Sequence, residues 1–288
     1  MQDLFFFAPP HTLISTVFIG ILGLLIGSFL NVVIHRIPKM MQRAEDNDVA
    51  EITGKERPHQ DKYNLMLPRS ACPHCQHQIT AAENIPVLSY LFLGGKCSQC
   101  KTRISVRYPI VEAVTGLLSA YAIWHFGSGI EGLSAVVCIW FLVALTGIDF
   151  DTQLLPDQLT LPLLWIGLLI NTRYTFTSLE QAVLGAALGY MSLWTVNAAY
   201  RLWRGHDGMG YGDFKLLAAL GAWLGAMNLP FIILAASMVG SVFGILMLLG
   251  KRLGWNLPFA FGPFLAGAGL IALFWGKQIT SQYLGLFS

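Results

Sequence analysis

The chain has 288 residues, of which 55% are hydrophobic and 12% are charged. This charged fraction is about half of the roughly 25% that is typical of soluble domains, which excludes an ordinary water-soluble fold. A formal net charge of +2 gives no sign of a nucleic-acid partner, and we expect none.

Long uncharged runs predict that the chain crosses a membrane several times. A helix needs about 20 mostly apolar residues to cross the hydrocarbon core. The run 216–250 is too long for one crossing, and Asn228–Pro230 predicts a turn that divides it. We therefore expect an all-α polytopic membrane protein with about eight transmembrane helices. The predicted spans are 12–34, 109–126, 132–148, 157–171, 181–202, 213–227, 230–250 and 256–275.

The basic residues indicate how these spans are oriented. Sixteen of the 18 lysines and arginines fall in 35–108, 201–215 and 251–252, which an eight-span arrangement places on one side. Loops rich in Lys and Arg stay in the cytoplasm, so we expect these segments to be cytoplasmic and both termini to lie outside. The spacing Gly23-x-x-x-Gly27 predicts close helix packing in the first span.

Residues 35–108 differ in composition from the rest of the chain. They hold most of the charge and four of the five cysteines, and they contain no apolar run of membrane length. We expect a small cytoplasmic loop domain between the first two spans. Its polar stretch 43–61 has few large apolar residues, which predicts flexibility.

Two CxxC pairs in this loop predict a structural zinc site. Four thiolates form a closed tetrahedral site for Zn²⁺, which leaves no open position for catalysis. Two disulfides or redox-active thiols are the alternatives, but a reducing cytoplasm disfavours stable disulfides. Cys138, alone in the third span, is expected to be a packing residue. The predicted ligands are Cys72, Cys75, Cys97 and Cys100.

Two aspartates stand at the edges of apolar runs. Asp149 closes the run 132–148, and Asp213 closes Gly210-Tyr-Gly-Asp just before the run 216–250. Such ionisable groups are costly in a membrane and usually face a partner or a water-filled cavity. The predicted topology puts both at the cytoplasmic edge, as an aspartyl protease requires, because one carboxyl must be protonated while the other is not.

Other carboxylates and other functions compete with this interpretation. Asp151 is an alternative to Asp149, because residues two apart on a helix differ by about 200° and cannot both face one seam. Asp157 fits the start of a helix after Pro156, and Lys215 would favour ionised Asp213 if it lay close in space. A transporter with an intramembrane Asp pair is one rival function, although we find no related halves. A non-catalytic scaffold built on the zinc loop is another.

Several motifs together point to a known family. In chain order they are Gly27–Pro38 (GSFLNVVIHRIP), the two CxxC pairs, Arg107–Glu112 (RYPIVE), Ile148–Asp157 (IDFDTQLLPD) and Gly210–Lys215 (GYGDFK). In this combination and order the chain resembles the type IV prepilin peptidases, bifunctional enzymes of Gram-negative bacteria. The resemblance extends nearly from end to end.

The resemblance implies an intramembrane aspartyl protease of the GxGD type. The two aspartates of the family correspond to Asp149 and Asp213, so the resemblance favours Asp149 over Asp151. Such enzymes cut the short basic leader from type IV prepilins and type II secretion pseudopilins at the cytoplasmic face. They then methylate the new N-terminal residue, usually Phe, with S-adenosylmethionine. The family's Gly-Lys pair before the second CxxC falls on Gly95 and Lys96. The implied location is the bacterial inner membrane, with both termini periplasmic.

The resemblance also divides the chain into three parts. Residues 1–34 are the first transmembrane helix, 35–108 the Cys₄ zinc loop associated with methyl transfer, and 109–288 the protease domain. We expect an acidic residue to meet the basic leader. Glu112 is expected either to pair with an arginine such as Arg107 at the mouth of the second span or simply to lie in the interface. The candidates for the leader are Glu112, Asp151 and Asp157.

Overall fold

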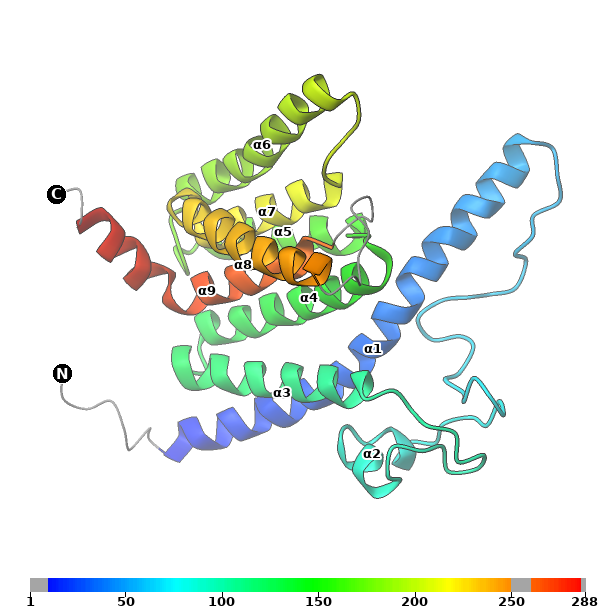
Figure 1. The fold of residues 1–288 in the computed structure, drawn as a ribbon. Coiled ribbons are helices and arrows are strands. Elements are labelled where there is room, and N and C mark those ends of the chain that lie inside the picture. The colour runs from blue at the N-terminus through cyan, green and yellow to red at the C-terminus, as the bar shows by residue number, and fades with distance from the viewer. Residues whose placement is uncertain (1–9, 250–259, 286–288) are drawn as a thin grey trace. The chain divides into compact units, whose positions relative to one another are not determined.

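The computed structural model describes residues 10–249 and 260–285, and the regular elements in these ranges are helices (Figure 1). The chain forms two compact units, Met1–Ala144 and Leu145–Ser288. The long helices are α1 (Pro10–Ile52), α3 (Arg107–Phe126), α4 (Ile130–Thr152), α5 (Asp157–Asn171), α6 (Leu179–Arg204), α7 (Tyr211–Leu224), α8 (Leu229–Leu249) and α9 (Gly262–Gly285). The short ones are α2 (Leu88–Phe92) and the 3₁₀ turns η1 (Ala82–Asn84) and η2 (Ala226–Asn228).

Within these ranges, four helices are long and apolar enough to span a membrane. They are Leu13–Ile52, Ile130–Thr152, Leu179–Arg204 and Ala226–Met247. The prediction of a helical membrane protein is therefore confirmed, whereas the number eight is not. Helices α5 and α7 have only 15 and 14 residues, fewer than the roughly 20 needed to cross the hydrocarbon core. The loop that carries Lys251 and Arg252 lies outside the described residues.

In the first unit, α1 extends well past the predicted end of its span at residue 34. It runs without interruption to Ile52, so the prediction that 43–61 is flexible is wrong for residues 43–52. Tertiary contacts explain the difference, because the following loop folds back along this part of the helix. Asn47 exchanges two hydrogen bonds with the backbone of His59. The guanidinium of Arg36 donates to the carbonyls of Asn64 and Pro68.

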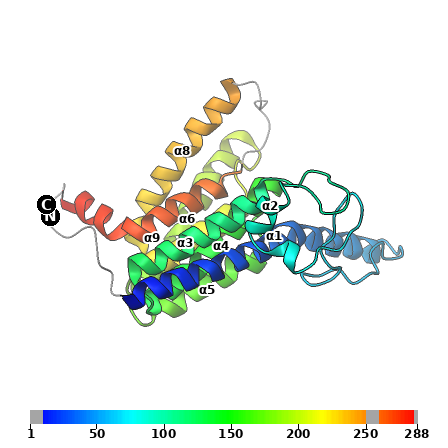
Figure 2. The ribbon, with the colours of Figure 1, turned by 90° about the horizontal axis from the view of Figure 1, so that it is seen from below.

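Helices α1 and α3 pack against each other in antiparallel directions (Figures 1 and 2). A Cβ at Gly23 would come within 2.7 Å of Ser119 Oγ, and one at Gly27 within 2.7 Å of the Glu112 Cα. Only glycine allows the backbones to approach so closely. The close packing predicted from Gly23 and Gly27 is therefore confirmed. Trp140 Nε1 of α4 also donates to Ser119 Oγ, at 3.0 Å.

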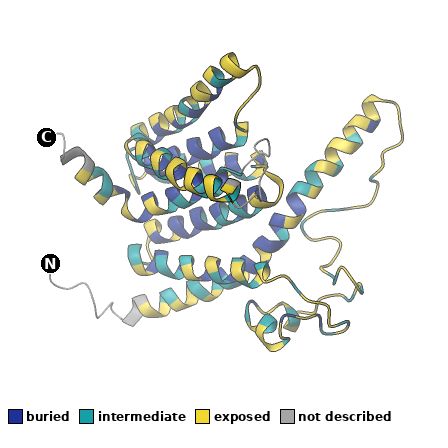
Figure 3. Cartoon of the chain, viewed as in Figure 1, coloured by how far each residue is buried: buried dark blue, intermediate teal, exposed yellow. Residues whose placement is uncertain are grey.

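Helix α7 forms the core of the second unit, and Figure 3 shows it buried along nearly its whole length. It packs against α5, α6 and α9. Gly185 of α6 and Gly221 of α7 lie in direct backbone contact, which a Cβ at either position would prevent. The indole N–H of Trp223 donates to the Leu163 carbonyl of α5 at 2.8 Å. A short helix is thus stable here because protein surrounds it on all sides.

The buried side chain of Asn171 provides a hydrogen-bond donor for the carbonyl groups at the C-terminal end of α7. Its amide nitrogen donates to the carbonyls of Ala222 and Trp223, and its oxygen accepts from the N–H groups of Phe176 and Thr177. The carbonyls at a helix end lack partners within the helix, so an outside donor stabilises this terminus. Helix α8 then begins at Leu229, so the run 216–250 is divided as predicted, but the break lies at residues 225–228 and not at 228–230.

Candidate active site and metal centre

Asp149 lies in the last turn of α4 and is only 3% exposed. Its Oδ2 accepts a hydrogen bond of 2.9 Å from the backbone N–H of Gly262, the first residue of α9. A Cβ at position 262 would come within 2.7 Å of that same oxygen. Glycine is therefore required where the start of α9 reaches the carboxylate.

Asp213 lies in the first turn of α7 and is also buried. Its Oδ1 has no hydrogen-bond partner in the described part of the chain. A buried polar atom without a partner is costly, and such atoms are found where a ligand, a water or a reacting group binds. The carboxyl of Asp213 is therefore available to a group that enters from outside the fold.

The two aspartates come together within the second unit. The side chain of Leu155 approaches both the Gly212 backbone and the Gly262 backbone. Gly212 directly precedes Asp213 and Gly262 bonds Asp149, so Leu155 lies between the two sites. The carboxyl groups are close enough for their charges to interact. The sequence separates them by two helices, and the packing of α7 against its neighbours brings them to one place.

Asp149 and Asp151 differ in their solvent exposure. Asp149 is buried, whereas Asp151 is exposed at the end of the same helix. This agrees with the rotation of about 200° between residues two apart on a helix. Burial beside Gly262 distinguishes Asp149 as the partner of Asp213, and its catalytic role remains a prediction.

Asn197 of α6 anchors the loop that precedes Asp213. Its amide donates to Asp207 Oδ1 at 2.8 Å, and its oxygen accepts from the N–H groups of Gly208 and Met209 at 2.8 and 3.1 Å. Asn197 is buried, and the sequence analysis did not single it out. An asparagine inside the uncharged run 181–200 is the signal that could have identified it.

Lys215 forms an ion pair with Asp157, with Nζ 2.6 Å from Oδ1. Asp157 begins α5 directly after Pro156, as predicted for a carboxylate at a helix N-terminus. The suggestion that Lys215 acts on Asp213 gains no support, because the ammonium pairs with Asp157. This pair connects the first turns of α5 and α7.

Glu112 joins the cytoplasmic loop to the packed helices of the first unit. Its carboxylate accepts a hydrogen bond of 2.7 Å from the backbone N–H of Val87. Val87 has a φ of +61°, a strained conformation for a β-branched residue. Ser28 of α1 contacts Asn84 of η1 at the same place, 3.3 Å apart. Segment 84–87 is thus bound to α1 and α3 through Ser28 and Glu112, and the position of Glu112 in the interface stays a prediction.

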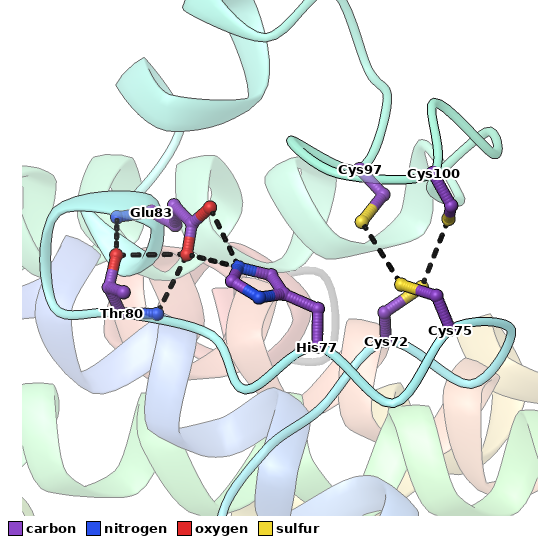
Figure 4. Close-up of polar contacts among 7 residues, drawn as sticks. All are labelled: Cys72, Cys75, His77, Thr80, Glu83, Cys97 and Cys100. Carbon is purple, nitrogen blue, oxygen red and sulfur yellow. Dashed lines mark hydrogen bonds and ion pairs between the residues drawn. The ribbon is translucent and has the colours of Figure 1, made fainter.

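The four predicted cysteines form a cluster, and their sulfur atoms all lie within 4.8 Å of one another. The Sγ atoms of Cys72 and Cys100 are 3.7 Å apart, and those of Cys75 and Cys97 are 3.9 Å apart (Figure 4). Four sulfurs about 2.3 Å from one ion at tetrahedral angles are about 3.8 Å apart. The cluster therefore fits a tetrahedral metal ion. Cys138 is buried within α4, as a packing residue would be.

The two CxxC pairs lie in turns of the same form. A single β-bridge closes each turn, Ala71 with Gln78 and Lys96 with Arg103. The residue after the second cysteine has a positive φ in both, +60° at Gln76 and +59° at Lys101. Each turn thus directs two sulfurs toward the same point.

The carboxylate of Glu83 bonds residues beside the first cysteine turn (Figure 4). Its carboxylate lies 3.2 Å from His77 Nε2 and accepts from the N–H and hydroxyl of Thr80 at 2.8 and 2.9 Å. Hydrogen bonds from Ser98, and then from Thr80 and His77, lower the pKa of Glu83 to about 2. Because His77 follows the first cysteine pair and Ser98 lies within the second, one ionised carboxylate orients both.

The thiols have unequal pKa values. Hydrogen bonds with the Thr102 side chain and backbone lower the pKa of Cys100 to about 6. The backbone N–H of His77 lowers the pKa of Cys75, but desolvation and the neighbouring thiols outweigh it and raise the value to about 11. A bound divalent cation favours the thiolate at every position of such a cluster.

Gly95 and Lys96, predicted from the resemblance for methyl transfer, lie between α2 and the second cysteine turn. Gly95 is buried against the ring of Tyr90 with a φ of +66°, and its N–H bonds the Tyr90 carbonyl. These contacts explain a glycine at this position. The side chain of Lys96 is exposed.

Comparison with known proteins identifies the family. The chain matches the Bacterial Peptidase A24 N-terminal domain over residues 21–126 and the Type IV leader peptidase family over 136–245. A protein of Pseudomonas aeruginosa named prepilin leader peptidase/N-methyltransferase is 54% identical over 92% of this chain and 91% of its own length. The chain belongs to the type IV leader peptidase family. The resemblance drawn from the motifs is therefore confirmed.

Further family members carry the same name. A relative from Aeromonas hydrophila is 51% identical over 96% of both chains, and one from Burkholderia pseudomallei strain 1026b is 48% identical over 94% of this chain and 88% of its own. No solved structure matches this chain significantly.

Proposed function

We propose that the chain removes the leader from type IV prepilins and type II secretion pseudopilins and then methylates the new N-terminal residue, usually Phe. The observation that carries the proposal is the meeting of buried Asp149 and Asp213 in one unit of a leader peptidase family member. The names of the relatives support both activities. A transporter is not favoured.

Asp149 and Asp213 act as the catalytic pair of this proposal. One carboxylate takes a proton from the attacking water, and the other, protonated, donates a hydrogen bond to the scissile carbonyl. Two carboxyls held this close share one proton, so the apparent pKa values belong to the pair. The N–H of Gly262 fixes the orientation of Asp149, and the Oδ1 of Asp213 is the atom free to meet substrate.

The cysteine cluster holds Zn²⁺ in our proposal, bound by Cys72, Cys75, Cys97 and Cys100. The sulfur spacing supports this assignment, because it suits a tetrahedral ion. The zinc is structural and orders the loop domain. The methyl donor is S-adenosylmethionine, and methyl transfer belongs to residues 35–108. Of the Gly95–Lys96 pair, Gly95 shapes the turn and the exposed Lys96 offers a cation to the donor.

The protein lies in the bacterial inner membrane with both termini in the periplasm. All eight long helices cross or insert into the bilayer, with α7 shielded from lipid by protein. Basic residues concentrated in 35–108 and 201–215 support a cytoplasmic active site. We divide the chain by function into the first transmembrane helix (1–34), the zinc loop (35–108) and the protease domain (109–288). The two compact units, by contrast, meet within α4.

Asp151 is the acidic residue that we assign to the basic leader. Glu112 is buried against Val87, and Asp157 lies eight residues beyond Asp149, at the start of α5. Asp151 is exposed two residues after Asp149, near where the scissile bond must lie. Replacing Asp151 with Asn should raise KM for prepilin and leave kcat nearly unchanged, because it removes binding and not chemistry.

Purified protein, a prepilin and labelled S-adenosylmethionine test the proposal, with mass spectrometry of the N-termini as the readout. Asp149→Asn and Asp213→Asn should abolish cleavage, whereas Asp48→Asn, exposed on α1, should cleave at the normal rate. Both catalytic variants should still methylate a pre-cleaved pilin. Normal cleavage by either variant would contradict the proposed pair. Ion flux in liposomes without cleavage would support the transporter instead.

A further inference from the structure

The segment 85–95 has an apolar surface that the proposed chemistry does not use. Its eleven residues carry no charge, although Glu83 precedes it and Lys96 follows it. Helix α2 exposes Leu88, Leu91 and Phe92, which are 53%, 68% and 86% accessible. Positions i, i+3 and i+4 share one face of a helix, so these three side chains form one surface. We call it the α2 face.

The opposite side of α2 is held by protein. Tyr90 packs on Gly95, and its hydroxyl lies 3.4 Å from the Ile104 carbonyl. The N–H of Val87, just before the helix, bonds the Glu112 carboxylate. The orientation of the α2 face is thus fixed by contacts behind it, and the apolar side chains point away from the loop domain.

These contacts place α2 beside the membrane-spanning part of the first unit. Figures 1 and 2 both draw α2 next to the first turns of α3. Gly27 of α1 packs on Glu112, at the level where Val87 is bound. At 1.5 Å per residue, Arg36 lies about 13 Å farther along α1 toward the cytoplasm. Segment 85–95 therefore contacts α3 where α3 packs on α1, farther from the cytoplasm than Arg36.

The apolar surface of α3 continues at this level. Ile110, Val114 and Leu117 are exposed on α3, which a spanning helix turns toward lipid. Exposed Lys96, Lys101 and Arg103 follow α2 in sequence, and basic groups near a membrane surface are attracted to anionic headgroups. Buried apolar area and electrostatic attraction to anionic lipids together hold a segment at the membrane interface, and segment 85–103 offers both.

We propose that the α2 face inserts into the cytoplasmic leaflet, at the boundary between headgroups and acyl chains. The loop domain, which carries the cysteine cluster, is then anchored to the membrane through α2 as well as through α1 and α3. The inference rests on the membrane placement of α1 and α3 proposed above and does not depend on either enzymatic activity. It places the loop domain at the lipid surface from which a pilin helix would emerge.

A lipid carrying a photoreactive diazirine in its acyl chain tests this on the unmodified, full-length protein in vesicles. After irradiation, mass spectrometry should find lipid adducts on peptides that contain 85–93, in addition to α1 and α3. The peptide 62–68 serves as the control, because it contains exposed apolar Met66 but lies near Arg36. Adducts on α1 and α3 with none on 85–93 would overturn the proposal.

Spin labels inserted by amber suppression at Phe92 and at Met66 give a second measurement that leaves all the cysteines in place. In nanodiscs the label at 92 should be more accessible to oxygen than to a water-soluble nickel chelate, and the label at 66 should show the reverse. A label at 92 that the chelate reaches readily would contradict the proposal. So would a label shielded from both reagents, which would indicate a protein partner or a second copy on this face.

These readouts separate this inference from the proposed function. Leu91→Asp with Phe92→Asp should reduce the adducts on 85–93 while zinc content stays at one ion per chain. If wild-type protein cleaves and methylates prepilin but shows no adducts on 85–93, the α2 proposal alone fails. If the adducts are present while Asp149→Asn still cleaves, the proposed catalytic pair alone fails.

Discussion

The backbone N–H of Gly262 holds Oδ2 of Asp149 at 2.9 Å, although 113 residues separate them in sequence. The bond joins the last turn of α4 to the first residue of α9. The orientation of one candidate catalytic carboxylate therefore depends on a helix from the end of the chain. Leu155 contacts Gly262 and also Gly212, the residue before Asp213. It therefore lies between the two aspartates.

Gly262→Ala should impair prepilin cleavage without unfolding the protein. The new Cβ would come within 2.7 Å of Asp149 Oδ2 and 3.2 Å of Leu155 Cδ1, so the carboxylate must move. A shift of about 1 Å in a reacting group can cost about 10²-fold in rate, and we expect a loss of that order in kcat/KM. Gly267→Ala, in the same helix with open space around it, should cleave normally. Equal rates for both variants would show that the Gly262 contact is not needed.

Asn197→Ala should loosen the loop that leads into Asp213. The change removes the acceptor of the Gly208 and Met209 N–H groups, which lie in a solvent-accessible loop, at a net cost of about 0.5–1.5 kcal/mol per hydrogen bond. We expect faster hydrogen exchange at these two amides and slower cleavage. Thr195→Ala is the matched control, because its exposed hydroxyl bonds only within α6. Unchanged exchange at 208 and 209 would rule out the anchoring role.

Cys97→Ser should remove the metal ion. Cys97 is buried in the cluster, and a closed four-thiolate site loses most of its affinity with one ligand. Metal analysis should find about one zinc per chain in the wild type and almost none in the variant. Methyl transfer should fall further than cleavage if residues 35–108 carry it. Cys138→Ala, a thiol far from the cluster in sequence, should keep its zinc, and loss of zinc from both variants would show a general defect.

Glu83→Ala should make the zinc easier to remove. The low pKa of about 2, below the ordinary 4.5, means that Glu83 is ionised at neutral pH and loses its stabilising charge only as the pH falls toward 2. At pH 7 a chelator should therefore extract zinc faster from Glu83→Ala than from wild type. Glu83→Gln should lie between them, because it keeps acceptors but loses the charge. Glu45→Ala, exposed on α1, should match wild type, and identical rates for all four proteins would refute the connecting role of Glu83.

Local patterns were enough to predict several features of the structure. The CxxC pairs predicted a four-sulfur cluster, because ligand type and spacing constrain a metal site locally. The glycines of α1 predicted close packing with a neighbouring helix, because only small residues allow it. The position of Asp157 at the start of α5 was predicted from the proline that precedes it. Each of these depends on residues close in sequence.

Other features depend on contacts between distant segments. The polar stretch after residue 43 is helical to Ile52, because Asn47 and Arg36 bind the returning loop. Asn197 of α6 donates a hydrogen bond to Asp207 in the loop that follows the helix. Lys215 lies two residues from Asp213 in sequence but pairs with Asp157 across to α5. Composition and spacing carry no information about such partners.

The sequence by itself determined the membrane class, the family, the two aspartates and the four cysteines, since each is written in composition or in a short motif. The tertiary structure decided which carboxylate is buried, placing Asp149 inside and Asp151 outside. It also decided that Gly262 reaches Asp149 and that Glu112 holds the loop at Val87. The reason is physical: burial and hydrogen-bond partners are set by how helices pack, and packing joins residues that no local pattern relates.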